Sequence, residues 1–271
     1  MLATRCLALI GAAALAASAT AATLVTQLPP SNGGTMRWSK LWIDPIGDND
    51  SDNDAICWED FVLSAPASLT HLEWWGTGAA ELGFRIDFWR QDPGTVAYQP
   101  LAVFDVYGPD PSPVHPEARF TVTPGQYSAT PGPGGLTHYV LELPTPVDLA
   151  ANDASNPRWF VAVIARSANF SQQWSWAQGL GGSNRTFWWL RGAHMFYSLG
   201  EGRAMIIGGT VAAACPGDTN GDGVVDFADL NEVLSSFNIV GAGQPGDVND
   251  DGRVDFADLN IVISAFNQPC P

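Results

Sequence analysis

The sequence has few basic residues. It holds 12 Lys and Arg against 28 Asp and Glu, which gives a formal net charge of −16. Proteins that bind DNA or RNA neutralise phosphates with Lys and Arg, and this chain lacks the charge to do so. We therefore expect no nucleic-acid partner.

Long apolar runs are also scarce, and the N-terminal one is the exception. Residues 1–22 hold one basic residue, Arg5, then an apolar run, and then the small residues Ala19, Thr20 and Ala21. This order is typical of a secretory signal peptide cleaved near Ala21 or Ala22. No later run reaches the length of a membrane-spanning helix. We expect a secreted protein with no membrane span, either free or attached to a cell surface.

Catalytic motifs are missing from the chain. It has no G-x-S-x-G or H-E-x-x-H motif, and its four His show no ligand spacing. Glycoside hydrolysis stays open as an alternative, because it needs only two carboxylates about 5 to 10 Å apart. Glu73, Asp87 and Glu142 are the candidates, but ordinary surface carboxylates are far commoner. We predict no catalytic residue.

Residues 23–211 show the alternation of apolar and polar residues that is typical of strands, with Pro and Gly between the runs. No segment there has the periodicity of an amphipathic helix. The pattern predicts a two-sheet β-sandwich of jelly-roll type. The expected strands cover residues 61–63, 71–75, 82–89, 101–107, 118–122, 138–143, 158–165, 173–176, 186–190 and 203–207.

All eleven Trp lie in this predicted sandwich. Trp rings suit the apolar C–H faces of sugars because they are large and rigid. Trp75 and Trp89 share strand faces with charged residues, so we predict them as an outward sugar platform. Packing inside the sandwich is the alternative. A run of five Asp between Asp44 and Asp54 is interpreted as a solvated acidic turn, with a further calcium loop as the alternative.

A duplicated segment near the C-terminus carries oxygen-bearing side chains at loop positions 1, 3, 5, 9 and 12, with Gly at position 6. Hard cations such as Ca²⁺ take six to eight oxygen ligands from loops of this kind. Position 6 needs a backbone conformation open mainly to Gly. The two sets are Asp218, Asn220, Asp222, Gly223, Asp226 and Asp229, and then Asp247, Asn249, Asp251, Gly252, Asp255 and Asp258.

Each loop leads into one apolar stripe with the spacing of an amphipathic helix, starting at Phe227 and at Phe256. Asp226 and Asp255 stand where an N-cap belongs, with an acidic residue in the first turn. Each repeat is therefore predicted to be a calcium loop followed by one helix.

Residues 215–271 resemble a type I dockerin, which is built from two such loop–helix repeats. The resemblance implies two bound Ca²⁺ ions. It adds the position 7 backbone carbonyls of Val224 and Arg253 to the ligands above. It also implies docking onto a cohesin-like domain through positions 10 and 11. Those positions are Phe227, Ala228, Phe256 and Ala257 here, and the aromatic rings there could equally fill the core between the helices.

Cysteine usage agrees with an exported protein. Of the four Cys, Cys6 falls in the signal peptide, and Cys57 is left as an odd thiol that we expect to be a buried strand residue and not a catalytic one. Cys215 and Cys270 bracket the dockerin-like region, whose two-fold repeat brings its ends together, so we expect a disulfide between them. Closing a loop of this size would stabilise the region by roughly 4 kcal/mol.

The expected order is a signal peptide (1–22), a β-sandwich (23–211), a linker (212–214) and an all-α dockerin-like domain (215–271). Residues 56–209 more loosely resemble a recurrent sandwich domain of secreted bacterial proteins, through Asp60-Phe61, Trp74-Trp75-Gly76 and the strand around Ile86. A lectin-like role is the nearest analogy. We expect a non-catalytic carbohydrate- or surface-binding protein in extracellular polysaccharide breakdown. The alternatives are a glycoside hydrolase or a structural protein of the cell surface.

Overall fold

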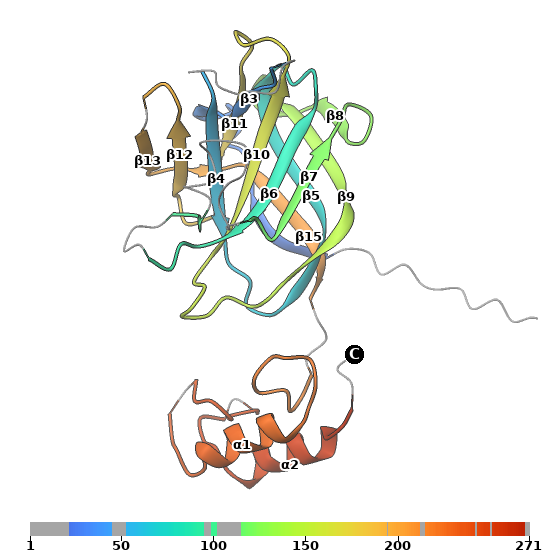
Figure 1. Cartoon of the computed structure of the whole chain (residues 1–271), viewed down its shortest axis with the longest axis vertical. Helices are drawn as coiled ribbons and strands as arrows, with labels where there is room; N and C mark the ends of the chain where they lie inside the picture. Colours follow the sequence, from blue (N-terminus) through green and yellow to red (C-terminus); the bar gives the residue numbers. More distant parts are fainter. Residues whose placement is uncertain are drawn as a thin grey trace, which may run out of the picture.

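The computed structural model describes residues 22–44, 53–94, 99–101, 115–193, 195–211, 215–241, 243–249 and 251–268. The predicted signal peptide up to residue 21, the linker 212–214 and Cys270 lie outside these residues. The chain is mainly β, with two sheets and two short α-helices (Figure 1). This confirms the mainly β prediction.

The first sheet has eight strands, and all of its pairings are antiparallel. Its central strand is β5 (Ala67–Gly78), which pairs with β15, β9 and β11. The remaining members are β1 (Ala22–Gln27), β2 (Met36–Trp38), β8 (Ser128–Pro131), β9 (Thr137–Leu149), β11 (Trp174–Gly179), β14 (Gly202–Arg203) and β15 (Met205–Val211). A short 3-10 turn, η2 (Pro133–Gly135), joins β8 to β9.

The second sheet has seven strands in the order β13-β12-β4-β3-β10-β6-β7. Only the β3–β10 pair is parallel. The strands are β3 (Lys40–Trp42), β4 (Ala55–Phe61), β6 (Phe84–Arg90), β7 (Ala118–Val122), β10 (Trp159–Ser167), β12 (Thr186–Leu190) and β13 (Met195–Leu199).

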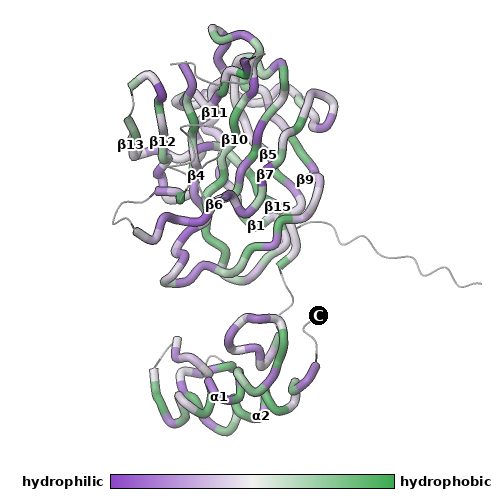
Figure 2. Tube along the Cα trace, viewed as in Figure 1, coloured by the Kyte–Doolittle hydropathy of each residue, from purple (hydrophilic) through white to green (hydrophobic). Residues whose placement is uncertain are grey.

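The two sheets share one hydrophobic core. Leu72 and Trp74 of β5 face Phe84 and Ile86 of β6 in a single cluster of buried residues. This face follows from the period of two along each strand. Hydrophobic and hydrophilic residues accordingly interleave along the strands (Figure 2). The pair of sheets around this core is the two-sheet domain.

The outer face of the seven-stranded sheet is also apolar. Phe160, Ala162 and Ile164 of β10 belong to a second buried cluster that includes Trp58 and Trp89. All of β10 except Arg166 is buried, so this strand is covered on both faces.

The C-terminal unit holds α1 (Phe227–Ser235) and α2 (Phe256–Ala265), which pack against each other. Its core is four fully buried valines, Val225, Val233, Val254 and Val262. Two come from the loops and two from the helices, so each repeat contributes equally to the core. No described helix has the length and apolar content that crossing a membrane requires.

Strand prediction succeeded where alternation was clear. The strands at Ala118–Val122 and Thr186–Leu190 match their predicted bounds. The prediction of a strand at residues 61–63 was wrong, because β4 runs from Ala55 to Phe61. That strand is buried along its whole length. It includes Glu59 and Asp60, and these two acidic residues made the segment look unlike a buried strand in the sequence. Most of the expected strand at 101–107 lies outside the described residues.

Candidate calcium loops and neighbouring sites

The first residue of each loop is held by backbone N–H groups of the same loop. The Asp218 carboxylate accepts hydrogen bonds from the N–H groups of Gly221 (2.8 Å), Asp222 (3.1 Å) and Gly223 (2.9 Å). In the second loop, the Asp247 carboxylate accepts from Asp251 (3.2 Å) and from the loop's central glycine, as Asp218 does. The chain therefore wraps around both position 1 carboxylates in the same way.

The residues at position 12 close the loops. The Asp229 carboxylate accepts from the N–H groups of Thr219 (2.7 Å), Asn220 (3.2 Å) and Asp226 (2.8 Å). Burial raises the pKa of Asp229, but these hydrogen bonds outweigh it and hold the pKa below its ordinary value. The carboxylate is therefore kept in the charged form that a cation needs.

The second loop repeats this closure. The Asp258 carboxylate accepts from the N–H groups of Val248 (2.8 Å), Asn249 (3.2 Å) and Asp255 (2.8 Å). These donors stand at loop positions 2, 3 and 9, as they do in the first loop. Two loops that differ in sequence at several positions thus share one hydrogen-bond pattern.

Positions 3 and 5 have matched geometry too. The Asn220 side-chain oxygen accepts from Asp222 N–H (2.8 Å), and Asp222 in turn accepts from Val224 N–H (3.0 Å). Asn249, Asp251 and Arg253 repeat both bonds at 2.9 Å. Gly223 and Gly252 at position 6 have φ of 87° and 83°, a region that favours glycine.

Both predicted N-caps are confirmed. Asp226 accepts from the N–H of Ala228, while Asp229 in the first turn accepts from the Asp226 N–H, which completes a capping box. Asp255 and Asp258 form the same box at the start of α2. The position 12 carboxylates therefore serve the helix ends as well as the loops.

The residues present fit Ca²⁺ by donor type. Each loop offers carboxylates, one Asn amide oxygen and the position 7 backbone carbonyl, which is the oxygen set that Ca²⁺ takes. In the part of the chain that the structure describes, no three His, Cys, Asp or Glu side chains are grouped closely enough to hold a metal ion. Asp250 lies outside that part. The fit rests on ligand order and backbone support, and not on a closed carboxylate cage.

The side chains at position 10 are exposed, which decides against the core-filling role that the sequence left open for them. Phe227 and Phe256 are 69% and 68% exposed, so they do not fill the core between the helices. Each ring meets a Phe of the other repeat edge-on. The ring centroids of Phe227 and Phe266 are 4.9 Å apart, and those of Phe237 and Phe256 are 5.0 Å apart. Ala228 and Ala257 are also exposed.

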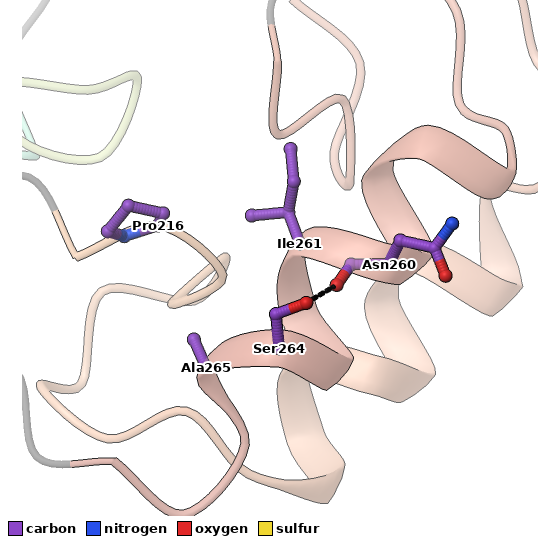
Figure 3. A pocket seen from close by; sticks show the side chains of 5 residues that line it. All are labelled: Pro216, Asn260, Ile261, Ser264 and Ala265. Carbon is purple, nitrogen blue, oxygen red and sulfur yellow. Dashed lines mark hydrogen bonds between the residues drawn. The ribbon is translucent and has the colours of Figure 1, made fainter.

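A shallow depression of about 350 Å³ lies beside α2 and is lined by Pro216, Asn260, Ile261, Ser264 and Ala265 (Figure 3). The Ser264 hydroxyl donates to the backbone carbonyl of Asn260 at 2.6 Å, within its own helix. Ser235 makes the same bond to Asn231 in α1. The lining is mostly apolar and holds no charged group, so this depression offers no catalytic chemistry.

The cysteines fall into two classes. Cys215 is disulfide-bonded, and its partner lies outside the described residues, as does the expected partner Cys270. Cys57 is a free thiol, fully buried in β4, as the sequence predicted. Burial raises the pKa of Cys57 to about 12, so it is not a reactive thiolate.

The prediction of Trp75 and Trp89 as an outward sugar platform was wrong. Their side chains are only 6% and 2% exposed. Trp75 stacks on His138 with ring centroids 4.2 Å apart, and the Arg119 guanidinium lies 5.9 Å above the Trp89 ring. His138 of β9 and Arg119 of β7, which come from neighbouring strands, cover the two rings.

The three candidate catalytic carboxylates do not share one site. Glu73 and Glu142 both contact His71 on the outer face of the eight-stranded sheet, at 3.0 and 2.8 Å. Asp87 is buried in the other sheet, where it pairs with Arg119 at 2.9 Å.

The acidic run before β4 is only partly described, because residues 45–52 lie outside the described residues. Asp54 is buried, and its carboxylate accepts from the Trp42 N–H at 2.8 Å. At this position the prediction of a solvated turn was wrong.

One buried polar junction joins residues that the sequence does not single out. The fully buried Arg203 donates to the Thr186 hydroxyl (3.1 Å), which donates to the Glu59 carboxylate (2.9 Å). The second oxygen of Glu59 and the side-chain oxygen of Gln27 have no hydrogen-bond partner within the described structure. No periodicity marks these residues, which are spread over four strands.

Comparison with known proteins gave no match: no family model, no curated protein and no solved structure is significantly similar to this chain.

Proposed function

We propose that the C-terminal unit is a dockerin-like module that binds two Ca²⁺ ions and attaches this secreted protein to a partner carrying a cohesin-like domain. The observation that supports this most is the paired closure of the loops. Asp229 and Asp258 each accept three backbone N–H bonds from equivalent positions. Such support fixes the ligands before the ion binds, which favours binding.

The ligands in this proposal are the side chains at positions 1, 3, 5 and 12 with the position 7 carbonyl, and position 9 acts through water. Bound Ca²⁺ would offset the repulsion among the carboxylates. It would also stabilise the unit by mass action, by roughly 4 kcal/mol at a thousandfold excess over the dissociation constant.

The exposed side chains at positions 10 and 11 form the proposed docking surface. Phe227, Ala228, Phe256 and Ala257 lie at the starts of the two helices, and both rings are open to solvent. Exposed aromatic rings are typical anchors of protein interfaces. α1 and α2 contain no Lys or Arg, so this surface suits a partner that offers an apolar pocket.

For the two-sheet domain we propose non-catalytic binding of carbohydrate, so that the whole protein contributes to extracellular polysaccharide breakdown by attachment. The domain is rich in Trp and carries some aromatic rings on its surface. Of the candidate carboxylates of the hydrolase alternative, Glu73 and Glu142 are both bonded to His71, and Asp87 lies apart from them in the other sheet.

Calcium titration of the full-length protein by calorimetry tests the metal proposal. Wild type should bind two Ca²⁺ per chain, and the double variant Asp229→Ala/Asp258→Ala should lose most of the heat. The matched control is Asp148→Ala/Asp153→Ala, which removes two exposed carboxylates of the two-sheet domain. Uptake of two ions by the position 12 variant would overturn the ligand assignment.

Capture from the proteins secreted by the source organism tests the partner. Wild type should retain a protein with a cohesin-like domain in Ca²⁺ and release it in chelator. Phe227→Ala/Phe256→Ala should weaken capture without changing calcium binding. Capture that is equally strong in chelator would contradict calcium-dependent docking.

A further inference from the structure

The seven-stranded sheet extends past the edge of its partner sheet. β2 is an edge strand of the eight-stranded sheet and lies against β4. β12 and β13 follow β4 in the second sheet and form its outermost strands, at the left flank in Figure 1. The inner face of the β12–β13 hairpin is therefore covered less than the centre of the domain.

Aromatic side chains occupy this less covered face. Trp188 of β12 and Tyr197 of β13 are paired in register, with ring centroids 5.8 Å apart and planes inclined by 42°. The Trp188 indole N–H donates to the backbone carbonyl of Trp38 in β2 at 2.8 Å, whereas the Trp38 side chain lies on the other face of the eight-stranded sheet, with its register partner Ser175. Trp188 and Tyr197 are half-buried, so part of each ring reaches solvent.

A fixed pair of charged groups adjoins the rings. The Arg37 guanidinium lies 5.7 Å from the centre of the Trp188 ring and 2.8 Å from the Glu201 carboxylate. Glu201 also pairs with the fully buried Arg203 at 2.8 Å and accepts a bond from the Thr35 hydroxyl. The Glu201 carboxylate is thus fixed by Arg203 and Thr35, and it holds Arg37 at the surface.

We propose that Trp188, Tyr197, Arg37 and Glu201, named here the flank cluster, bind a neutral polysaccharide. This deepens the proposed function of the two-sheet domain and rests on it. Rigid aromatic faces contact the apolar C–H faces of sugar rings. Arg37 donates to sugar hydroxyls and Glu201 accepts from them. A polyanionic glycan is disfavoured, because the chain has a formal net charge of −16.

The flank cluster differs from Trp75 and Trp89 in the exposure of its rings to solvent. Its rings come from two neighbouring strands, β12 and β13, and keep exposed surface, whereas Trp75 and Trp89 are covered by His138 and Arg119. Its polar groups bond to one another and leave the rings partly open. A sugar bound here would meet aromatic and hydrogen-bonding groups at the same time.

Affinity electrophoresis of the full-length protein in gels containing soluble cellulose, xylan or mannan derivatives tests the proposal, with polygalacturonate as the acidic arm. Arg37→Ala and Tyr197→Ala should each weaken binding to a neutral glycan about tenfold. Tyr197→Phe keeps the aromatic face and should recover part of the affinity. The control Phe170→Ala removes a ring that is 58% exposed outside the cluster, and it should bind as wild type does.

The outcomes separate this inference from the proposed function. If wild type binds a glycan and the flank variants, with unchanged melting points, bind it equally well, the flank cluster is overturned but carbohydrate binding stands. If wild type is retained by polygalacturonate alone, the neutral ligand is overturned. If wild type binds no glycan, the carbohydrate role of the whole domain fails and this inference fails with it.

Discussion

The backbone N–H of Asn267 donates a hydrogen bond to the carbonyl oxygen of Val225, 2.9 Å away. This bond joins the end of the second repeat to the first loop. Asn238 makes the equivalent bond to Val254 at 2.8 Å, from the end of the first repeat to the second loop. Each loop is thus bonded to the segment that follows the helix of the other repeat, and calcium binding in one loop should stabilise both.

Asn238 and Asn267 follow their helices with φ of 68° and 60°, in the left-handed region. Asn tolerates this conformation better than most residues, whereas β-branched residues are strained there. We expect Asn238→Val to destabilise the C-terminal unit by about 1 to 2 kcal/mol. Asn238→Gly should be nearly neutral. Denaturant unfolding of the full-length protein in calcium buffer measures both, and equal stability of the two variants would contradict the conformational argument.

The repeated Gly217 and Gly246 pack against the helix of the opposite repeat. A Cβ on Gly246 would lie 2.8 Å from the Val233 Cα, and one on Gly217 would lie 3.0 Å from the Val262 Cα. We expect Gly246→Ala to unfold the C-terminal unit at lower denaturant concentration. Gly243→Ala is the matched control, because it has positive φ with open space around it. If both variants lose the same stability, backbone strain and not the helix contact explains the effect.

A chelator should lower the stability of the C-terminal unit and leave the stability of the two-sheet domain unchanged. Removal of Ca²⁺ takes away stabilisation by mass action in the C-terminal unit and leaves the apolar core of the two-sheet domain unchanged. Scanning calorimetry should show a transition for the C-terminal unit that falls in temperature with chelator, and a second transition that does not move. Restoration by added Ca²⁺ but not by Mg²⁺ is expected. A chelator effect on the two-sheet transition would contradict this assignment.

The C-terminal unit was easier to predict from sequence than the two-sheet domain. Its helix caps and helix starts are local and occur twice, so each copy supported the other. Buried charges in the two-sheet domain gave no such signal. Arg203, Lys40 and Glu59 look like surface residues in the sequence, yet all three are buried. Their partners come from distant strands, and only the paired sheets bring them together. For the same reason, the surroundings of Trp75 and Trp89 were misjudged.

Gly202 should not tolerate a side chain. A Cβ there would lie 2.9 Å from both the Gln27 and the Glu59 side-chain oxygens, and these atoms have no hydrogen-bond partner within the described structure. We expect Gly202→Ala to destabilise the two-sheet domain by about 1 to 3 kcal/mol, since overpacking costs that much in a filled interior. Gly200→Ala, with nothing near its Cβ, is the control. Thermal unfolding of the two-sheet domain measures the difference in stability between the two variants. Unchanged stability of Gly202→Ala would contradict the close packing around Gly202.

Glu59 should make the stability of the two-sheet domain depend on pH. Burial raises the pKa of this carboxyl well above 4.5, and the neighbouring Asp60 adds to the increase. A group with a raised folded pKa stabilises the protein fully below its unfolded pKa and loses that contribution as the pH rises through the folded pKa. Wild type should therefore lose stability relative to Glu59→Gln as the pH rises above about 4.5. A constant difference in unfolding free energy between the two proteins from pH 4 to pH 9 would contradict the raised pKa.

His71 offers a second, independent pH dependence on the outer face of the eight-stranded sheet. Its two ring nitrogens lie 2.8 Å from Glu142 and 3.0 Å from Glu73, and both contacts are hydrogen bonds to carboxylates only when the imidazole carries two protons. Burial lowers the pKa of His71, but the hydrogen bonds to these carboxylates outweigh it and raise the pKa above 6.5.

The stability that His71 contributes should be complete below pH 6.5 and lost as the pH rises through the folded pKa. NMR titration of the His71 ring should give a raised pKa in wild type. Glu142→Gln should lower that pKa, because it removes one charged acceptor and keeps the shape of the side chain. Glu117→Gln changes a carboxylate that contacts Arg90 and should leave the titration unchanged. A wild-type pKa at or below 6.5 would mean that burial outweighs the two carboxylates.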